Sequence, residues 1–242
     1  MEKKIILVTG KNGFIAKNII EYFTQRKYKV LSVSHSDDLV LLEEYCKQCD
    51  IVFHTAAVQR TSCSADFYEG NVEYTSKLIN GLAKSDKKIQ IFFTTSIGID
   101  KPSDFATTKL EAEKMLRSFS EESNVELYVY KLNNIFGKYG KPNFNNVVAT
   151  YCYNVANGLP LLVNDPSAMI PFTYVEDLMI DFENCLNGKV DNNYYIKPSV
   201  IIKKTLGDVV KILGDIKNCT YANQDFEIKM KHTYDSYLTE NE

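Results

Sequence analysis

The sequence has no excess of positive charge. Its 242 residues contain 28 Lys+Arg against 31 Asp+Glu, which gives a formal charge of -3, and only three of the basic residues are arginines. Such a balance provides no basic surface for a nucleic acid and no polybasic surface for an anionic membrane. We therefore expect partners that are small molecules or proteins, with no nucleic acid and no membrane among them.

Long apolar runs are also missing. No segment is long and apolar enough to cross a bilayer, and Met1 to Lys4 precede only an apolar run of strand length, unlike a signal peptide. We expect a soluble cytoplasmic protein.

The cysteines lack the pattern of a disulfide scaffold or a metal site. Six of them are scattered through a chain too large to need disulfides, which favours reduced thiols in a cytoplasm. Cys46-x-x-Cys49 has no second ligand pair, so we interpret it as two thiols on the last turn of a helix. We expect no metal.

The chain has no linker, no internal repeat and no low-complexity segment. Its length fits one α/β domain with a small appended lobe. We expect a nucleotide-binding core over residues 1–140, to which residues 160–187 partly return, and a small lobe over 141–242.

The first motif of the chain is a strand, a glycine turn and a helix. Four apolar β-formers, Ile5 to Val8, lead through Thr9-Gly10-Lys11-Asn12-Gly13 into an amphipathic segment, Phe14 to Phe23. Gly10 can adopt a tight turn closed to other residues, and Gly13 lets a ligand approach the backbone where free N–H groups and the helix dipole favour a pyrophosphate. The spacing G-x-x-G-x-x-A, with Ala16 last, predicts a dinucleotide site; an ordinary turn with two glycines is the alternative.

Strands and helices then alternate. We predict strands at Lys29 to Ser34, Asp50 to Ala57, Ile89 to Ser96 and Val125 to Lys131, and helices over 38–47, 67–82 and 104–122. This rhythm predicts an α/β fold, a Rossmann-type doubly wound parallel sheet. A less regular C-terminal lobe follows, with a helix from Val147, a strand from Ile170 to Val175, and helices from Asp177 to Leu186, from Thr205 and from Phe226 to Leu238.

Cofactor choice depends on the end of the second strand. An acidic residue there commonly binds the ribose 2′-OH of NAD. The strand ends here in Ser34 and His35, with Lys11 in the glycine turn. Without a carboxylate to repel a 2′-phosphate, NADP is the predicted cofactor, and NAD remains open.

The ends of the third and fourth strands carry the next candidates. Small residues at Ala56 and Ala57 would let a flat cofactor lie against the backbone. His54, inside an apolar strand, is interpreted as a satisfied core histidine rather than a catalytic one. Ser96 either points into the ligand crevice or caps a turn.

Several short motifs, taken together, resemble those of the extended short-chain dehydrogenase/reductases that act on nucleotide sugars, the NAD-dependent epimerase/dehydratase family. They are Thr9-Gly10-x-x-Gly13-x-x-Ala16, His54-Thr55-Ala56-Ala57, Gly70-Asn71-Val72, Thr95-Ser96, Lys109 on its helix, Asn134-Ile135-Phe136-Gly137 and Phe172-Thr173-Tyr174-Val175-Glu176-Asp177. Residues 136–150 look closest to capsule-biosynthesis reductases of UDP-linked 4-keto-6-deoxy sugars. Those enzymes carry a C-terminal cupin domain, for which we expect no room in this chain.

The resemblance implies a catalytic set. Ser96 would hydrogen-bond the substrate carbonyl, a tyrosine on the next helix would transfer the proton, and Lys109 would lower the pKa of that tyrosine and bind the nicotinamide ribose. The tyrosine position is Phe105. Three readings stay open: a substitution made to trap ligands, a natural variant in which Ser96 or water gives the proton, or a binding protein without catalysis.

The resemblance also implies binding residues. Expected cofactor contacts are Gly10, Lys11, Asn12, Gly13, Phe14, Ile15, Ser34, His35, Ala56, Ala57, Val58, Asn71, Thr95, Lys109, Leu132 and Ile135. Expected substrate contacts are Arg60, Ser96, Asn134, Lys138, Lys141, Asn145 and Asn146. Ile170 stands where the family often has an arginine, so the usual nucleotide clamp is altered.

The predicted function is NADP-dependent reduction of a nucleotide-linked 4-keto-6-deoxy sugar. The alternatives are a C4 epimerase with the same core and a non-catalytic NADP-binding protein; Ile97-Gly98-Ile99 lacks the acid and base of a dehydratase. A homodimer is expected, since the family pairs two helices across a symmetry axis. Its apolar surface would come from Ile79, Leu82, Met115, Leu116 and Phe119.

Overall fold

The computed structural model describes residues 4–238. The expectations for Met1 to Lys3 and for the polar tail after Leu238 lie outside the described residues. The chain forms two compact units: the chain up to Leu132 together with Asp191–Lys197, and Asn133–Val190 together with the chain from Pro198 onward.

A parallel sheet of five strands in the order β2-β1-β3-β4-β5 forms the first unit. All four pairings between neighbours are parallel. The strands are β1 (Ile5–Thr9), β2 (Lys29–Val33), β3 (Ile51–His54), β4 (Ile89–Ser96) and β5 (Val125–Leu132). Because both faces are covered, the strands read as nearly continuous apolar runs. The predicted fold class is therefore confirmed.

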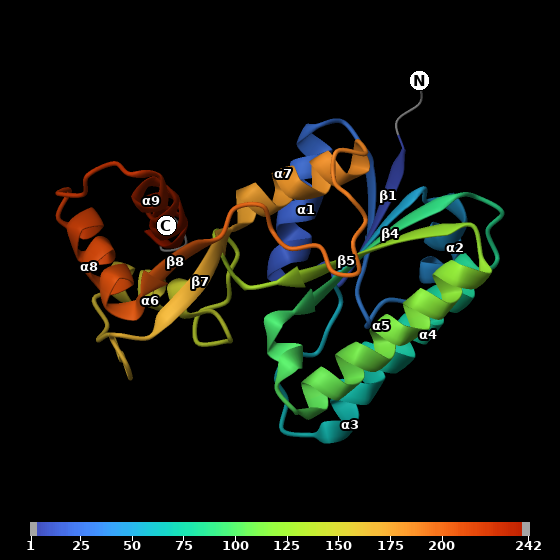
Figure 1. The fold of residues 1–242 in the computed structure, drawn as a ribbon, viewed down its shortest axis with the longest axis horizontal. Coiled ribbons are helices and arrows are strands. Elements are labelled where there is room, and N and C mark those ends of the chain that lie inside the picture. Colours follow the sequence, from blue (N-terminus) through green and yellow to red (C-terminus); the bar gives the residue numbers. More distant parts are fainter. Residues whose placement is uncertain (1–3, 239–242) are drawn as a thin grey trace. The chain divides into compact units, whose positions relative to one another are not determined.

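Helices cover both faces of this sheet (Figure 1). The helices of this unit are α1 (Phe14–Gln25), α2 (Leu39–Gln48), α3 (Ser64–Phe67), the π-helical turn η1 (Tyr68–Glu73), α4 (Tyr74–Leu82), the 3-10 turn η2 (Ile97–Asp100) and α5 (Asp104–Glu122), of which the short α3 and η2 lie beyond the sheet. Side chains alternate across the sheet. Val52 and Ile91 pack in one buried cluster with residues of α2, α4 and α5. Phe53 and Phe92 face the other way, where Phe53 packs on Phe23 of α1, with ring centroids 5.4 Å apart.

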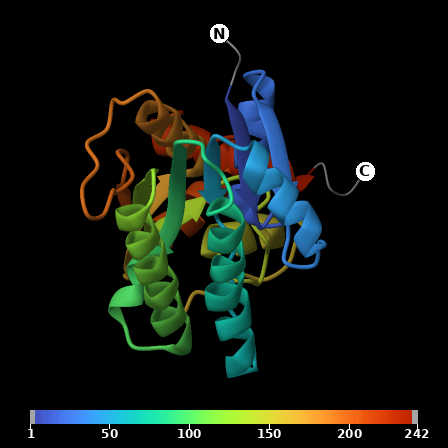
Figure 2. The ribbon, with the colours of Figure 1, turned by 90° about the vertical axis from the view of Figure 1, so that its right-hand side faces the viewer.

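The two long helices of one face, α4 and α5, lie side by side (Figure 2). The apolar residues proposed for a dimer surface do not all point outward. Leu82 and Leu116 are buried in the core against the sheet, whereas Ile79 and Phe119 are only partly buried. The expectation is wrong for Leu82 and Leu116, because a helix that covers a sheet packs its apolar stripe against the sheet.

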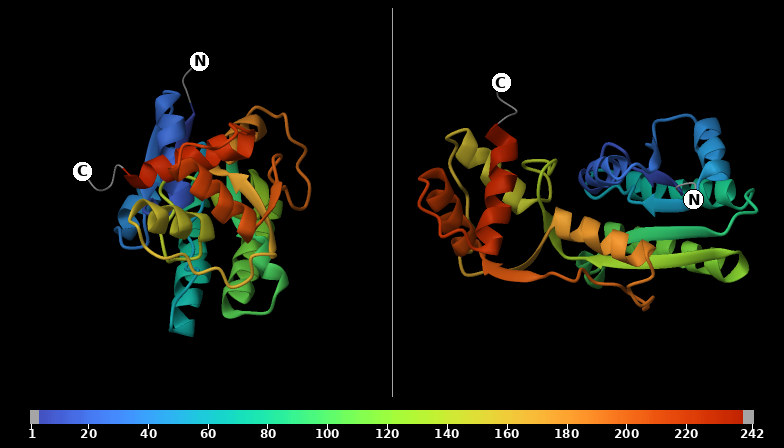
Figure 3. Two further views of the ribbon diagram at one scale, coloured as in Figure 1. Left: turned by 90° about the vertical axis from the view of Figure 1, so that its left-hand side faces the viewer. Right: turned by 90° about the horizontal axis from the view of Figure 1, so that it is seen from above.

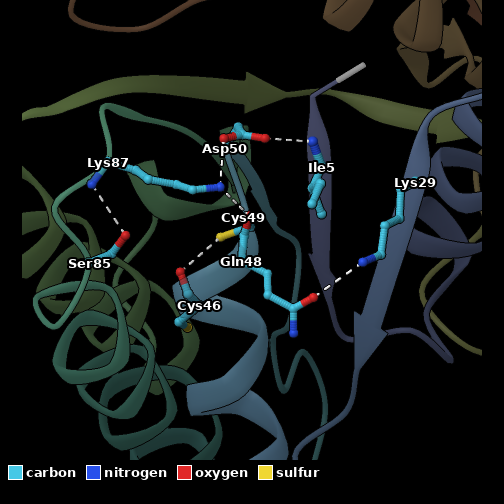
Figure 4. A network of polar contacts seen from close by, with 8 residues as sticks. All are labelled: Ile5, Lys29, Cys46, Gln48, Cys49, Asp50, Ser85 and Lys87. Carbon is cyan, nitrogen blue, oxygen red and sulfur yellow. Dashed lines mark hydrogen bonds and ion pairs between the residues drawn. The ribbon is translucent and has the colours of Figure 1, made fainter. Parts of the chain in front are cut away.

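Polar contacts link segments at the N-terminal ends of the strands (Figure 4). The Asp50 carboxylate accepts hydrogen bonds from the Ile5 N–H at 2.7 Å and from Lys87 Nζ at 2.9 Å. Nearby, Cys46 lies in α2 and Cys49 caps its end, so only Cys46 belongs to the helix. Both thiols are free and buried, and burial raises the pKa of each. They fill space in the core.

The segment 191–197 returns to the first unit beside β5. Ile196 donates its N–H to the Val129 carbonyl, and its own carbonyl accepts from the Lys131 N–H, both at 2.8 Å. Tyr194 and Tyr195 are thereby brought against α5. Nothing in the sequence pattern predicts this return.

The second unit contains a small sheet and four helices among the described residues. The sheet has the order β6-β7-β8, with β6 (Asn134–Phe136) and β7 (Met169–Tyr174) parallel and β8 (Ile202–Thr205) antiparallel to β7. Three of its helices pack on one another: α6 (Val147–Ala156), α8 (Leu206–Lys217) and α9 (Asp225–Leu238), as Figure 3 shows. The fourth, α7 (Val175–Leu186), follows β7 directly.

Most predicted elements are present with small shifts. The second and third strands were predicted to run to Ser34 and Ala57, which is too far. In the structure β2 ends at Val33 and β3 at His54. The short strands β6 and β8 are absent from the prediction, and the helix predicted over 67–82 begins at Ser64 and contains a π-helical turn. Short strands give too few residues for an alternation to show.

Candidate functional site

The carboxyl ends of β1 to β5 meet at one edge of the parallel sheet, where ligands of such folds bind. The turn after β1 is tight. Gly10 has a φ of +77°, and a Cβ at this residue would lie 2.8 Å from the Ala56 Cα. The Gly10 N–H donates to the Val33 carbonyl at 2.8 Å. Only glycine fits here, as predicted.

The same turn delivers the start of α1 to this edge. Gly13 is the N-cap, no side chain caps the helix, and no acidic residue lies in its first turn. Asn12 and Gly13 are exposed, and Phe14 and Ile15 are partly exposed. Free N–H groups at a helix start attract anionic oxygen. These residues fit the pyrophosphate of a dinucleotide.

A carboxylate lies at the end of β2, against the premise of the NADP prediction. Asp37 accepts the Ser34 N–H at 2.8 Å and pairs with Lys11 Nζ at 2.7 Å. The hydrogen bond from Lys11, followed by that from Ser34, lowers the pKa of the Asp37 carboxyl. Ser34 is buried and His35 is exposed. The premise was wrong because the chain turns back after His35 and returns Asp37 to the strand end.

His54 is a core residue, as predicted. Its ring nitrogens contact Thr9 Oγ1 at 2.7 Å and Thr75 Oγ1 at 2.9 Å, and its side chain is buried. Burial lowers the pKa of His54 to about 3, with the nearby Lys109 charge acting in the same direction. The imidazole therefore stays neutral at physiological pH and is not an acid catalyst there.

Asn71 holds the segment that follows β3. Its amide oxygen accepts the Val58 N–H at 2.8 Å, while its amide nitrogen donates to the Val58 carbonyl and to Thr108 Oγ1. The side chain is buried, so its polar atoms are occupied by the protein. We interpret Asn71 as the residue that positions Ala56, Ala57 and Val58 for a ligand.

Two hydroxyl side chains end β4. Thr95 Oγ1 is buried and has no hydrogen-bond partner among the described residues. Ser96 is partly exposed, and its Oγ accepts the Gly98 N–H at 3.0 Å. The capping alternative is therefore confirmed, and because the Oγ accepts in this contact its hydrogen remains able to donate; a role toward a ligand stays a prediction.

The helix α5 places Phe105 and Lys109 one turn apart on one face. Phe105 is partly buried, and Lys109 is buried with its Nζ 3.9 Å from the centroid of the Phe93 ring. Burial lowers the pKa of Lys109 to about 7, and the negative charge of Glu113 opposes that fall. A cation–π contact replaces part of the lost hydration of the ammonium.

Glu113 is a buried carboxylate that sequence reasoning missed. Its Oε1 accepts Arg117 Nε at 2.9 Å and Arg117 Nη2 at 2.8 Å, and the carboxylate also raises the pKa of the neighbouring Tyr195. The i, i+4 spacing of Lys109, Glu113 and Arg117 was the available signal.

The remaining predicted site residues divide between the units. Arg60 is exposed and Leu132 is buried in the first unit. The second unit holds Ile135, Asn134, Lys138, Lys141, Asn145 and Asn146. Asn146 caps α6 by accepting the Ala149 N–H at 3.0 Å, as expected, and Asn134 donates to the Pro171 carbonyl.

A cavity of about 340 Å³ opens in the second unit beside α6. Its lining consists of Asn143, Val147, Thr150, Tyr151, Asn154, Leu162, Asn164 and Leu206. The lining thus mixes amide and apolar side chains.

Comparison with known proteins gives a family. The model of the NAD dependent epimerase/dehydratase family matches residues 6–180 of this chain. The chain belongs to that family. Its sheet is the NAD(P)-binding Rossmann fold, and the match runs from β1 into α7.

Two relatives lie near 30% identity. A UDP-2-acetamido-2,6-beta-L-arabino-hexul-4-ose reductase of Pseudomonas aeruginosa is 28% identical over 88% of this chain and 58% of its own length. The crystal structure of the capsular polysaccharide assembling protein CapF of Staphylococcus aureus matches with a TM-score of 0.87 and 29% identity, over 98% of this chain and 66% of that one. This chain therefore spans less than two thirds of either relative.

More distant structures share the fold. A UDP-glucose 4-epimerase of Thermotoga maritima matches with a TM-score of 0.82 at 17% identity, over 98% of this chain and 100% of that one. Within residues 4–238, no helix is long and apolar enough to cross a membrane, and no group of three His, Cys, Asp or Glu side chains is arranged to hold a metal ion.

Proposed function

We propose that this chain is a nicotinamide-dependent reductase that converts the C4 ketone of a nucleotide-linked 4-keto-6-deoxy sugar to an alcohol. The observation that carries the proposal is that Ser96, whose Oγ acts only as an acceptor toward Gly98, ends β4, and that the buried Lys109 rests on Phe93 of the same strand. The reductase name of the Pseudomonas relative supports the substrate class.

The residues of the first unit fit the cofactor. The uncapped start of α1 and the exposed Gly13 suit its pyrophosphate, and the unpartnered Thr95 hydroxyl lies at the adjacent strand end. When bound, the reduced nicotinamide supplies the hydride. Ser96 would hold the carbonyl and Lys109 the ribose. The NADP preference predicted from the sequence has lost its premise, since Asp37 lies at the end of β2.

Side chains of the second unit support the substrate assignment. The cavity beside α6 suits the nucleobase, and Lys138, Lys141 and Asn134 supply donors for phosphate or sugar in the same unit. Arg60 is an exposed donor in the first unit. The substrate, its carrier nucleotide, a cytoplasmic location and a homodimer are parts of this proposal.

Stoichiometry tests the reductase against the epimerase. Incubation with a UDP-linked 4-keto-6-deoxy sugar and NADPH or NADH should oxidise one equivalent of cofactor per alcohol formed. An epimerase of the transient-ketone type would interconvert two C4 alcohols with no net oxidation. Cofactor binding with neither outcome, in the chain and in Phe105→Tyr, would support the non-catalytic alternative.

A further inference from the structure

Reduction of a ketone requires a proton as well as a hydride, and position 105 carries no phenol to give one. The oxygen of the carbonyl becomes an alkoxide and must be protonated to give the alcohol. Phe105 occupies the position of the family's acid and has no ionisable hydrogen. The proton must therefore come from another group at the site or from water.

The neighbouring hydroxyl groups are poor sources of the proton. Ser96 and Thr95 can share a hydrogen bond with the alkoxide, but a serine or threonine hydroxyl is a very weak acid. Thr108 donates to the Asp104 carbonyl at 2.8 Å and accepts from Asn71, so it is already engaged. His54 is enclosed and neutral.

Lys109 is the remaining ionisable group. Its ammonium lies on the helix face of Phe105, one turn later, and rests on Phe93 of the strand that ends in Ser96. We infer that Lys109 Nζ gives its proton to the developing alkoxide, and that the buried Glu113 carboxylate keeps Lys109 charged for this purpose. The inference rests on the proposed reductase function.

Three elements contribute the ionisable groups that surround Lys109. On α5, Glu113 lies one turn further along and is fixed by Arg117, whose Nη2 donates to the Tyr194 carbonyl at 2.7 Å. From the returning segment, Tyr195 faces Glu113; burial first and then Glu113 raise the pKa of Tyr195 to about 12, so its hydroxyl stays neutral. From β3, His54 is neutral.

This arrangement balances opposing effects. Burial makes the ammonium a stronger acid than a solvated lysine, and the carboxylate of Glu113, held in place by Arg117, limits the change. An acid whose pKa lies near the working pH transfers a proton most effectively. The step balances: the carbonyl carbon gains a hydride, the C=O π pair moves to oxygen, and oxygen takes the proton from Nζ. The amine left behind regains its proton from solvent.

The test follows Lys109 and turnover together. In the cofactor complex, NMR of isotope-labelled lysine side chains should give a titration midpoint for Lys109 that coincides with the pH at which ketone reduction falls as pH rises. In Glu113→Gln both midpoints should move down together by about one pH unit, because a negative charge near the ammonium is lost. Glu111→Gln, an exposed acid on the same helix, should move neither.

Three outcomes would overturn the inference. The Lys109 titration and the pH–rate profile of the unaltered chain could have different midpoints, the rate profile of Glu113→Gln could stay in place while its Lys109 titration shifts, or the unaltered chain could show no turnover. Phe105→Tyr separates the last case from failure of the proposed function. If the variant reduces the ketone and the unaltered chain does not, the site is a reductase and Lys109 is not its acid. If neither reduces it, both ideas fail. The comparison of midpoints in the unaltered chain needs no variant to fold.

Discussion

At the scale of single residues, Asp37 has the largest consequence for cofactor choice. Its carboxylate pairs with Lys11, the cation that would meet a 2′-phosphate, and lies beside the strand end where the adenine ribose binds in this fold. It therefore opposes NADP in two ways, by repulsion and by engaging Lys11.

Asp37→Asn should raise the affinity for NADPH relative to NADH by ~3–10-fold, because it removes a partly exposed charge whose effect solvent screens. Asparagine can still accept the Ser34 N–H, so the turn should persist. The measurement is the ratio of dissociation constants, by calorimetry. Asp38→Asn is the matched control, since Asp38 is exposed, caps α2, and asparagine caps as well. An unchanged ratio in Asp37→Asn would show that Asp37 does not meet the ribose.

Residue types near the ends of strong strands could be predicted from the sequence, and residues delivered by tertiary turns could not. His54 and Ser96 are the last residues of β3 and β4, so the strand pattern was enough to predict their positions. Asp37 and Tyr195 reach the site region through returns of the chain that no periodicity marks. Glu113 looked like one more charged residue on a helix, and only burial distinguishes it.

At the scale of elements, the turn between β1 and α1 depends on glycine for two separable reasons. Gly10 has a positive φ, and its missing Cβ makes room for the backbone at Ala56. Gly158, at the end of α6, has a similar φ of +67° but nothing within 4 Å of a Cβ. The pair separates backbone strain from steric exclusion.

Gly158→Ala should lower the free energy of unfolding by about 1–2 kcal/mol, the cost of a left-handed backbone for alanine. Gly10→Ala should cost a further ~1–3 kcal/mol, since either β1 or the Ala56 segment must shift. Urea unfolding of both variants, followed through each unit's transition, gives the comparison. An equal loss of unfolding free energy in the two variants would mean that the backbone at Ala56 shifts without cost. Cofactor affinity should then be retained in Gly10→Ala.

The strength of the local signal decided which elements the sequence predicted. β4 (Ile89–Ser96) and α5 (Asp104–Glu122) were predicted with their observed bounds, because each has a long apolar pattern and α5 starts at the N-cap Ser103. β6 and β8 are short and depend on pairing with β7, which is a tertiary property. The π-helical turn before α4 has no period that a sequence pattern distinguishes from an α-helix.

At the scale of the whole molecule, the question is which surface of α4 and α5 remains for a partner copy. The core takes Leu78, Leu82 and Leu116, so these helices offer less apolar surface than the sequence suggested. Ile79, Met115 and Phe119 remain partly exposed, and Leu110 is 42% exposed. Leu110 and Phe119 lie on opposite faces of α5, so an isologous pairing through Leu110 would bury the most exposed of these side chains.

Leu110→Glu should therefore convert a homodimer to a monomer at micromolar concentration, because two carboxylates would be placed in or beside a symmetric apolar contact. The mass in solution, by light scattering after size-exclusion chromatography, reports the change. Leu162→Glu is the matched control: Leu162 is 80% exposed but lies in the second unit, away from α4 and α5, and its substitution should leave the mass unchanged. A monomeric mass for the unaltered chain would end the dimer hypothesis. A dimer that survives Leu110→Glu would place the interface on another face and leave the exposure of Leu110 without this explanation.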